Sequence, residues 1–394
     1  MRTPVVRGCR RDRVVLATLY ALVVVVFLVS VAQYQRPKTG LTYLIEFGDA
    51  YHLQKLPAVR EVPHYTHAFS QGYDGQFYAQ LAVDPLLRDR RIDEALDTPP
   101  YRARRILFSW TAYLLGLGQP EWILKVYAMQ NVVAWLVLAG LLLVWLPPTT
   151  PRHLAAWAGA LFGAGLIGSV RLALLDGPSL VLLVLAVLAI ERGRAWTGAV
   201  VMALAGLGRE TNLLGGTVLA TRLPASLREA AAAASQAAIV VAPVVVWALY
   251  VRAVYAGYTY SNVDNFGVPF AGYLERWVHT LETLRAEGWG SLARYNLASF
   301  VGVTTQAVFV VTRWQWGSPW WRLGAVYCVL LATLSLPVWE GYPGASMRVL
   351  LPLSFAFNVL VVQSRWCWPL VVLGNLSVWQ GVKAIEVPFL SDWV

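Results

Sequence analysis

Long apolar segments recur along the whole sequence, and most come close to the length that a helix needs to cross a lipid bilayer, about 20 residues. Of the 394 residues, 57% are hydrophobic and only 14% are charged, whereas about 25% charged residues is usual for a soluble protein. Such repeated segments are typical of membrane-spanning helices. The sequence therefore predicts an all-α polytopic membrane protein that forms a single integral membrane domain over residues 1–394.

The charged residues sort to the two sides of the predicted membrane. When the N-terminus is placed inside, the N-terminal tail and the turns on that side carry the entire excess of basic residues, a net charge of +10. This bias is typical of cytoplasmic segments. We therefore expect residence in the plasma (inner) membrane, a cytoplasmic N-terminus and an extracytoplasmic C-terminus. Basic residues scattered over short turns suit topology and lipid contact, so nucleic-acid binding is not expected.

This arrangement predicts about eleven membrane spans. Two short apolar halves, 195–207 and 212–221, are separated by Gly208-Arg209-Glu210-Thr211, which predicts a helical hairpin whose apex is buried near the outer surface. The other predicted spans are 14–33, 121–146, 153–171, 177–191, 233–252, 295–312, 319–336, 349–364 and a last one that ends near Lys383.

Two long loops, 34–120 and 253–294, are predicted on the outside. Loops beyond about 15 residues are usually functional or disordered, and the aromatic and apolar residues of the first argue against disorder. Within it, 103–118 begins with basic residues and continues as an apolar helix that is slightly short for a span. We expect it to lie on the outer surface. A crossing here would move Arg192 and Arg194 to the outside, against the charge bias.

An acidic residue in the first loop is the leading candidate for chemistry. Asp74 lies in Tyr73-Asp74-Gly75-Gln76, just ahead of a predicted helix, where the adjacent glycines allow a tight turn. A plain helix N-cap explains most Asp-Gly pairs. The aromatic and amide neighbours, Tyr73 and Gln76, and the outer loop itself give equal weight to a functional site. A carboxylate there can accept the proton of an acceptor hydroxyl.

Basic residues at the predicted outer surface could bind a phosphate group. Arg102, Arg104 and Arg105 open the surface helix, where lipid headgroups are the simpler partners and a lipid-linked phosphate is the functional one. Arg348, at the start of the 349–364 span, either snorkels to the membrane surface or contacts phosphate.

Charged residues also interrupt or flank the apolar segments. Ionisable groups at membrane depth usually face a cavity or a partner, so Arg209 and Glu210 are candidates for a site. Adjacent residues diverge on a helix, and each of the two is expected to have its own partner. Asp176 in Leu175-Asp176-Gly177-Pro178 matches a helix start, with a supporting role in the site as the second interpretation.

Sequence motifs for several other chemistries are absent. The five His residues show no metal-ligand spacing, and the sequence contains no Walker loop, Rossmann fingerprint or GxSxG motif. The residues themselves therefore predict no metal site.

The order of these features resembles that of the GT-C glycosyltransferases, integral membrane enzymes that use polyprenyl-phosphate-linked sugars. The shared features are a basic inside N-terminus, one span, a long outer loop with an early acidic residue, a surface helix and many short-looped spans, and they cover most of the chain. The segments that resemble those of bacterial, mannosyltransferase-like members are GYDGQFYAQLAVDP, DTPPYRARRILFSW, LLDGPS, LAGLGRET and MRVLLPL.

The resemblance implies an inverting glycosyltransferase (a hexosyltransferase) that acts on the extracytoplasmic face. Its catalytic base would be an acidic residue of the first loop, with Asp74 the best match and Asp49 the second. The role of binding the donor phosphate would fall to Arg348 and Arg209, assisted by Arg102, Arg104 or Arg105. Supporting positions are Asp176, Glu210, Tyr73 and Gln76. Some members of the family require a divalent cation such as Mg²⁺ or Mn²⁺, and the sequence leaves this requirement open.

Two other functions stay open. A polytopic transporter or flippase would show ionisable residues near mid-span and repeated broken helices, whereas here only 208–211 interrupts a predicted span. A non-catalytic subunit of envelope glycan assembly is compatible with the same sequence. The lipid bilayer is a partner in every case, and the acceptor is left open among a glycan, a lipid and a protein.

Overall fold

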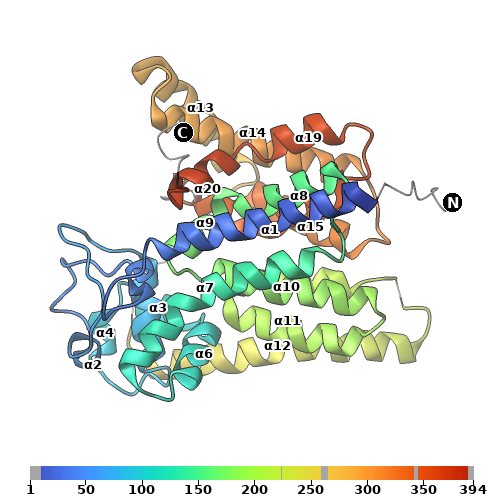
Figure 1. Cartoon of the computed structure of the whole chain (residues 1–394). Coiled ribbons are helices and arrows are strands. Elements are labelled where there is room, and N and C mark those ends of the chain that lie inside the picture. The colour runs from blue at the N-terminus through green and yellow to red at the C-terminus, as the bar shows by residue number, and fades with distance from the viewer. Residues whose placement is uncertain (1–9, 223, 259–264, 341–344, 389–394) are drawn as a thin grey trace.

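The computed structural model describes residues 10–222, 224–258, 265–340 and 345–388, and their regular secondary structure is helical (Figure 1). Within these ranges there is no β-strand, and extended segments meet only as isolated bridges such as Gly48–His67. The all-α class predicted from the sequence is confirmed.

Six short helices form between the first long helix and the second. They are η1 Leu41–Ile45, α2 Pro57–Arg60, α3 Asp74–Val83, α4 Ile92–Ala95, α5 Pro99–Ala103 and α6 Leu107–Leu115. The other elements are α1 Arg10–Ala32, α7 Pro120–Leu142, α8 Pro151–Phe162, α9 Ala164–Arg171, α10 Asp176–Glu191, α11 Ala195–Gly208, η2 Glu210–Leu219, α12 Leu227–Val254, α13 Ala271–Glu287, α14 Ser291–Thr312, α15 Pro319–Thr333, α16 Leu336–Glu340, α17 Ala345–Val349, α18 Leu351–Val361, α19 Cys367–Gly374 and α20 Val378–Ala384.

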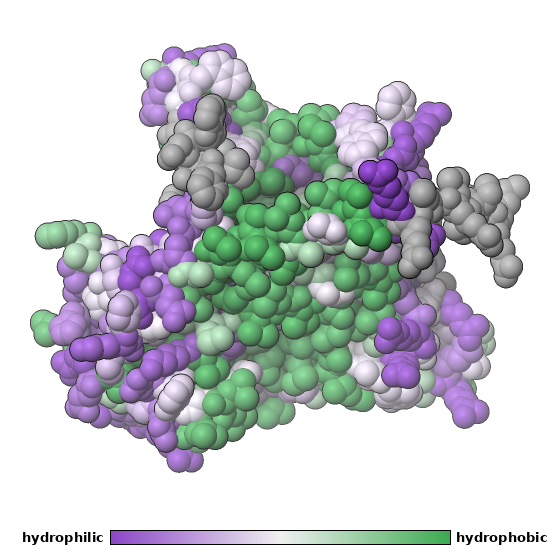
Figure 2. Space-filling model, viewed as in Figure 1, coloured by the Kyte–Doolittle hydropathy of each residue, from purple (hydrophilic) through white to green (hydrophobic). Residues whose placement is uncertain are grey.

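The longer helices run side by side as a bundle (Figure 1). Residues 34–106 gather at one end of this bundle, at the left of Figure 1, and we call this the loop end. Apolar side chains cover the middle of the face seen in Figure 2, and polar residues lie toward both ends of it. This distribution is consistent with a helical membrane protein, because a bilayer requires an apolar belt between polar ends.

Four helices of the described chain, α1, α7, α12 and α14, are long and apolar enough to cross a membrane by length and composition. Helices α8 and α9 qualify as a fifth segment if the pair is counted as one span, although it bends by 44°. The bend falls at Gly163, which lies between the two helices.

The predicted count of about eleven spans is therefore wrong. Four of the predicted spans fold as helices that are too short to cross a bilayer, with 16 residues in α10, 14 in α11, 15 in α15 and 11 in α18. At 1.5 Å per residue these helices measure about 24 Å or less, which is short of the roughly 30 Å apolar core of a bilayer. Hydropathy locates apolar segments, but it does not reveal where the helix inside each segment ends.

The interruption predicted at 208–211 occurs where α11 ends. Arg209 is extended, with φ −162° and ψ 128°, and the chain continues as the 3-10 helix η2. Arg322 of α15 stabilises the far end of η2, because its guanidinium donates to the carbonyl oxygens of Thr217 at 3.2 Å and Val218 at 2.8 Å. Carbonyls at a helix C-terminus otherwise lack partners.

The loop region is a packed structure held by buried polar groups. The Gln80 side chain of α3 accepts the Leu56 N–H at 2.8 Å and donates to the Ala95 carbonyl at 2.8 Å. Helix α6 packs against α3 and α7, and its Ser109 hydroxyl donates to the carbonyl of Tyr78 at 2.9 Å. With nine residues, α6 is too short to cross a bilayer.

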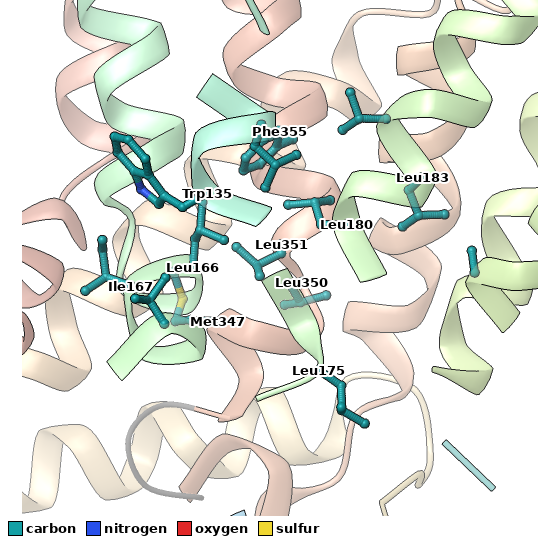
Figure 3. Packing of buried hydrophobic residues seen from close by; sticks show 14 of the residues in the cluster. Trp135, Leu166, Ile167, Leu175, Leu180, Leu183, Met347, Leu350, Leu351 and Phe355 are labelled. Atoms are coloured by element: carbon teal, nitrogen blue, oxygen red, sulfur yellow. The ribbon is translucent and has the colours of Figure 1, made fainter. Parts of the chain in front are cut away.

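The apolar core joins α7, α9, α10 and α18 (Figure 3). Trp135 of α7 lies beside Leu166 and Ile167 of α9 in Figure 3 and is fully buried. Its ring stacks on Phe27 of α1 with centroids 3.7 Å apart, and its indole N–H donates to the Leu161 carbonyl at 2.9 Å. One side chain thus ties three helices together.

Replacing this tryptophan is expected to destabilise the protein strongly. Trp135→Ala leaves a cavity and an unpaired carbonyl, which should cost about 3–5 kcal/mol. Trp122→Ala on the same helix is the control, because Trp122 is 56% exposed. Thermal unfolding of the detergent-purified protein should show a large loss for the first variant and a small one for the second. Equal losses would contradict the packing described above.

Candidate functional site

A cavity of about 840 Å³ opens at the loop end, within the size range of small-molecule sites. Its polar lining comes from α3, the α5–α6 turn, the start of α10, the α11–η2 junction and α17. These residues include Asp74, Tyr78, Tyr101, Arg104, Arg105, Asp176, Arg209, Glu210 and Arg348. An apolar part of the lining comes mainly from α15 and α16, with Val326, Val329, Leu330, Leu334, Pro337 and Val338. One cavity is therefore lined by both charged and apolar side chains.

Asp74 occupies the first position of α3. The next residue must be small, because a Cβ at Gly75 would overlap the carbonyl oxygens of Leu172 and Ile45. The first turn of α3 therefore presses directly against the backbone ahead of α10, and Asp74 lines the cavity beside it.

The Asp74 carboxylate is held by an arginine from α5. Arg102 donates from Nη2 to Asp74 Oδ1 at 2.8 Å. Burial by itself raises the pKa of Asp74, but the charges of Arg102, Arg348 and Arg105 outweigh it, so the pKa lies below its ordinary value. Asp74 is consequently an ionised carboxylate at neutral pH.

Arg105 connects the loop region to the 3-10 helix η2. Its Nε donates to Glu210 Oε2 at 2.8 Å, and its two other nitrogens donate to the hydroxyls of Tyr78 at 3.1 Å and Tyr101 at 2.7 Å. Burial lowers the pKa of Arg105, but Glu210 and the two tyrosines raise it well above its ordinary value. The guanidinium therefore stays charged at the cavity wall.

Asp176 contacts two arginines. Its Oδ1 contacts Arg209, and its Oδ2 lies 3.6 Å from Nη1 of Arg348. Arg348 also donates to the Tyr73 hydroxyl at 3.0 Å. The Asp176 side chain is only 4% exposed. A single buried carboxylate thus faces two guanidinium groups, which leaves this part of the wall with a positive charge.

Four of the residues singled out in the sequence lie outside the cavity lining, namely Asp49, Gln76, Arg102 and Tyr73. Asp49 and Gln76 bind backbone groups of the loop region. Asp49 accepts the backbone N–H groups of Phe69 at 2.8 Å and Ser70 at 3.0 Å, and these bonds lower the pKa of Asp49. Gln76 accepts the Gly48 N–H at 3.2 Å. Both side chains stabilise the turns ahead of α3, so the geometry favours Asp74 over Asp49 as the first-loop acid.

The cavity brings together most of the other residues named from the sequence. Those that line it are Asp74, Asp176, Arg209, Glu210, Arg348, Arg104 and Arg105, while Arg102 lies behind Asp74 and Tyr73 contacts Arg348. The sequence analysis missed Tyr78 and Tyr101 in the lining, and it assigned no site role to Asp97, which contacts Arg102. Tyr78 could have been predicted from the sequence, because it follows Asp74 by four residues and so lies on the same face of a helix.

No protein-family model matches the sequence, and a search of curated proteins finds no match either. Within the part of the chain that the structure describes, no group of three or more His, Cys, Asp or Glu residues could hold a metal ion. Inferences about function therefore depend on the residues of the cavity.

Removal of the shared carboxylate is expected to destabilise the protein. Asp176→Asn leaves two buried guanidinium groups without their counter-charge, which should cost about 3–5 kcal/mol. Glu121→Gln is the control, because the Glu121–Lys125 pair is partly exposed and should contribute less than about 1 kcal/mol. Thermal unfolding measures both. If Asp176→Asn unfolds no earlier than Glu121→Gln, Asp176 does not neutralise Arg209 and Arg348.

Proposed function

We propose that this protein is a membrane glycosyltransferase of the GT-C type. In this proposal it moves a hexose from a polyprenyl-phosphate donor to an acceptor hydroxyl on the extracytoplasmic face, with inversion at the anomeric carbon. The observation that carries the proposal is the cavity, which is lined by an ionised carboxylate, several arginines and the apolar side chains of α15 and α16. A donor of this class has both a charged phosphate and an apolar chain, and the lining offers groups that suit each of them.

The charge of the lining supports a donor with a single phosphate. Among the residues that the structure describes, the charged ones in the lining are Arg104, Arg105, Arg209 and Arg348 with Asp74, Asp176 and Glu210, an excess of one positive charge. A sugar phosphodiester carries one negative charge, whereas a diphosphate carries two. Arginine is suited to this role because its planar fork pairs with phosphate oxygens.

The chemistry is a single displacement. Asp74 accepts the proton of the acceptor hydroxyl as its oxygen attacks the anomeric carbon, while the bond from that carbon to the phosphate oxygen breaks. The phosphate leaves with the bonding electron pair. Arg348 and Arg209 stabilise the charge that develops on it, as fixed cations do at other leaving groups. One displacement inverts the configuration of the sugar.

The proposal places the loop end outside the cell. The N-terminus, on the other side of α1, is then cytoplasmic. An odd number of crossings, such as the five that result when α8 and α9 form one span, would place the C-terminus on the extracytoplasmic side. A flippase for lipid-linked sugars is the second candidate, because it would also need a cavity for a lipid phosphate and because the bend between α8 and α9 supplies a broken helix. The two functions differ in whether the bond from the sugar to the phosphate is cleaved.

Transfer from labelled polyprenyl-phosphate hexoses tests the proposal. Asp74→Asn should lower the rate by about 10²–10⁴-fold, because it removes the base. Arg348→Ala should lower it by about 10²–10³-fold, because the leaving phosphate loses a cation. Asp89→Asn is the control, because Asp89 is a loop carboxylate whose charged partner is Arg91. Full activity in folded Asp74→Asn would rule out the assigned base. A parent protein that cleaves no such donor would leave the flippase as the better proposal.

The pH dependence follows from the lowered pKa of Asp74. A carboxylate with a depressed pKa stays ionised until the pH falls through that pKa, which here lies below the ordinary value of 3.8. The transfer rate should therefore be about equal at pH 5 and pH 7. A sigmoidal loss of rate centred near pH 6, which Asp74→Asn abolishes, would show that the pKa is raised instead.

A further inference from the structure

Arg102 is a largely buried arginine beside the proposed base. Its guanidinium lies 5.0 Å from the ring centre of Phe77 and 5.3 Å from that of Tyr78, and its side chain is only 8% exposed. Its guanidinium nitrogens donate hydrogen bonds to two carboxylates. Nε and Nη2 donate to the two oxygens of Asp97 at 2.8 and 2.6 Å, and Nη2 also donates to Asp74 Oδ1 at 2.8 Å.

The two carboxylates occupy different places. Asp74 lines the cavity, whereas Asp97 lies outside the lining, behind Arg102. Asp97 also accepts the backbone N–H of Thr98 at 2.7 Å, which fixes its own orientation at the start of α5. The bidentate pairing with Asp97 uses Nε and one Nη2 hydrogen of Arg102, and Nη1 donates to the Tyr78 hydroxyl at 3.4 Å. Asp74 receives one hydrogen bond, from Nη2 to one of its two oxygens.

We propose that Asp97 is a positioning residue. It pairs with the guanidinium of Arg102 outside the cavity lining, so that Arg102 donates one hydrogen bond to Asp74. Asp74 therefore stays basic enough to accept a proton. The role of Asp74 as base rests on the proposed function, but the arrangement of the three side chains does not.

The physical reason is a competition for one cation. An arginine that pairs with a single carboxylate prefers the bidentate form, in which both oxygens are engaged. Such a pairing would stabilise the anion of Asp74 further and make it a poorer base. With Asp97 present, the positive charge of Arg102 is shared, and the negative charge of Asp97 also favours proton uptake by its neighbour.

Other groups near Asp74 also act on its charge, but they do not cancel the effect of Asp97 on the basicity of Asp74. Arg105 and Arg348 also act on the Asp74 charge, and Tyr78 and Tyr127 are its titratable neighbours from α3 and α7. Arg105 is engaged by Glu210 and Arg348 by Asp176. Arg102 is the one that donates a hydrogen bond directly to Asp74 among the side chains that the structure describes, so its orientation has the greatest effect.

The test compares Asp97→Asn with Asp89→Asn in the full-length protein. Both substitutions remove one loop carboxylate that is paired with an arginine, but only the first concerns Arg102. The first readout is the ¹³C NMR titration of aspartate-labelled protein in detergent, with the Asp74 signal assigned through Asp74→Asn. Asp97→Asn should lower the midpoint of Asp74 by roughly one pH unit, and Asp89→Asn should leave it unchanged. An unchanged or raised midpoint in Asp97→Asn would overturn the proposal.

The second readout is kinetic and uses labelled polyprenyl-phosphate mannose as the donor probe. A weaker base should lower kcat by roughly 3- to 10-fold in Asp97→Asn, with KM for the donor unchanged. Asp97→Glu should restore part of the rate, because it returns a carboxylate to Arg102. A rise in KM with constant kcat would indicate a role in donor binding and would contradict positioning.

Two further outcomes distinguish a misfolded variant, or a failure of the proposed activity, from a failure of the positioning role. Asp97→Ser keeps a side-chain oxygen that can accept the Thr98 N–H while it removes the charge, so it should lower the Asp74 midpoint as Asp97→Asn does, even if the asparagine variant does not fold. If the midpoint falls as expected but the parent protein cleaves no polyprenyl-phosphate sugar, the positioning of Asp74 stands and the proposed glycosyltransferase activity fails.

Discussion

Pairing between arginines and carboxylates from distant parts of the chain is the constraint on which the loop end depends. A buried charge without a counter-charge costs several kcal/mol, and more within a membrane. Arg105 meets Glu210 across 105 residues of sequence, and Arg348 meets Asp176. The loop region, η2, α10 and α17 are therefore joined by charges that none of them could bury alone. The cavity exists where these segments meet.

The interrupted helices explain why this charge shares the cavity lining with apolar side chains. Helix α11 ends at Gly208, so Arg209 and Glu210 leave the helical path at the cavity instead of facing lipid. Helix α15 is not interrupted there, and its Val326 and Leu330 side chains line the same cavity. A ligand in this space could contact both cations and hydrocarbon, which is the combination that a lipid phosphate requires.

Much of the fold and part of the site could be predicted from the sequence, and the reasons differ. Apolar composition was sufficient for the all-α class, and a charged interruption of an apolar run was sufficient for the break at Arg209. The number of spans could not be obtained in this way. Hydropathy averages over a window, whereas α18 has only 11 residues because the helix there ends early.

The partners of the site residues were harder still. Asp74 could be named from its glycine-flanked turn in the long first loop, and Arg348 from its place at the start of an apolar segment. The link between Asp97 and Arg102 spans five residues and matches no helical repeat. The pairing of Arg105 with Glu210 depends on the tertiary fold, so no local pattern could have revealed it. Only the packed structure distinguishes Asp74, which lines the cavity, from Asp49, which accepts a backbone N–H in a turn.

The central claim is that the cavity binds the phosphate of a polyprenyl lipid between its arginines. The most direct measurement is a cryo-EM structure of the protein with an unreactive polyprenyl monophosphate. We expect the phosphate within hydrogen-bonding distance of Arg348 or Arg209, with the first prenyl units along the apolar side chains of α15. A lipid bound only elsewhere, for example in the apolar groove that Val26 and Val371 line, would contradict the account.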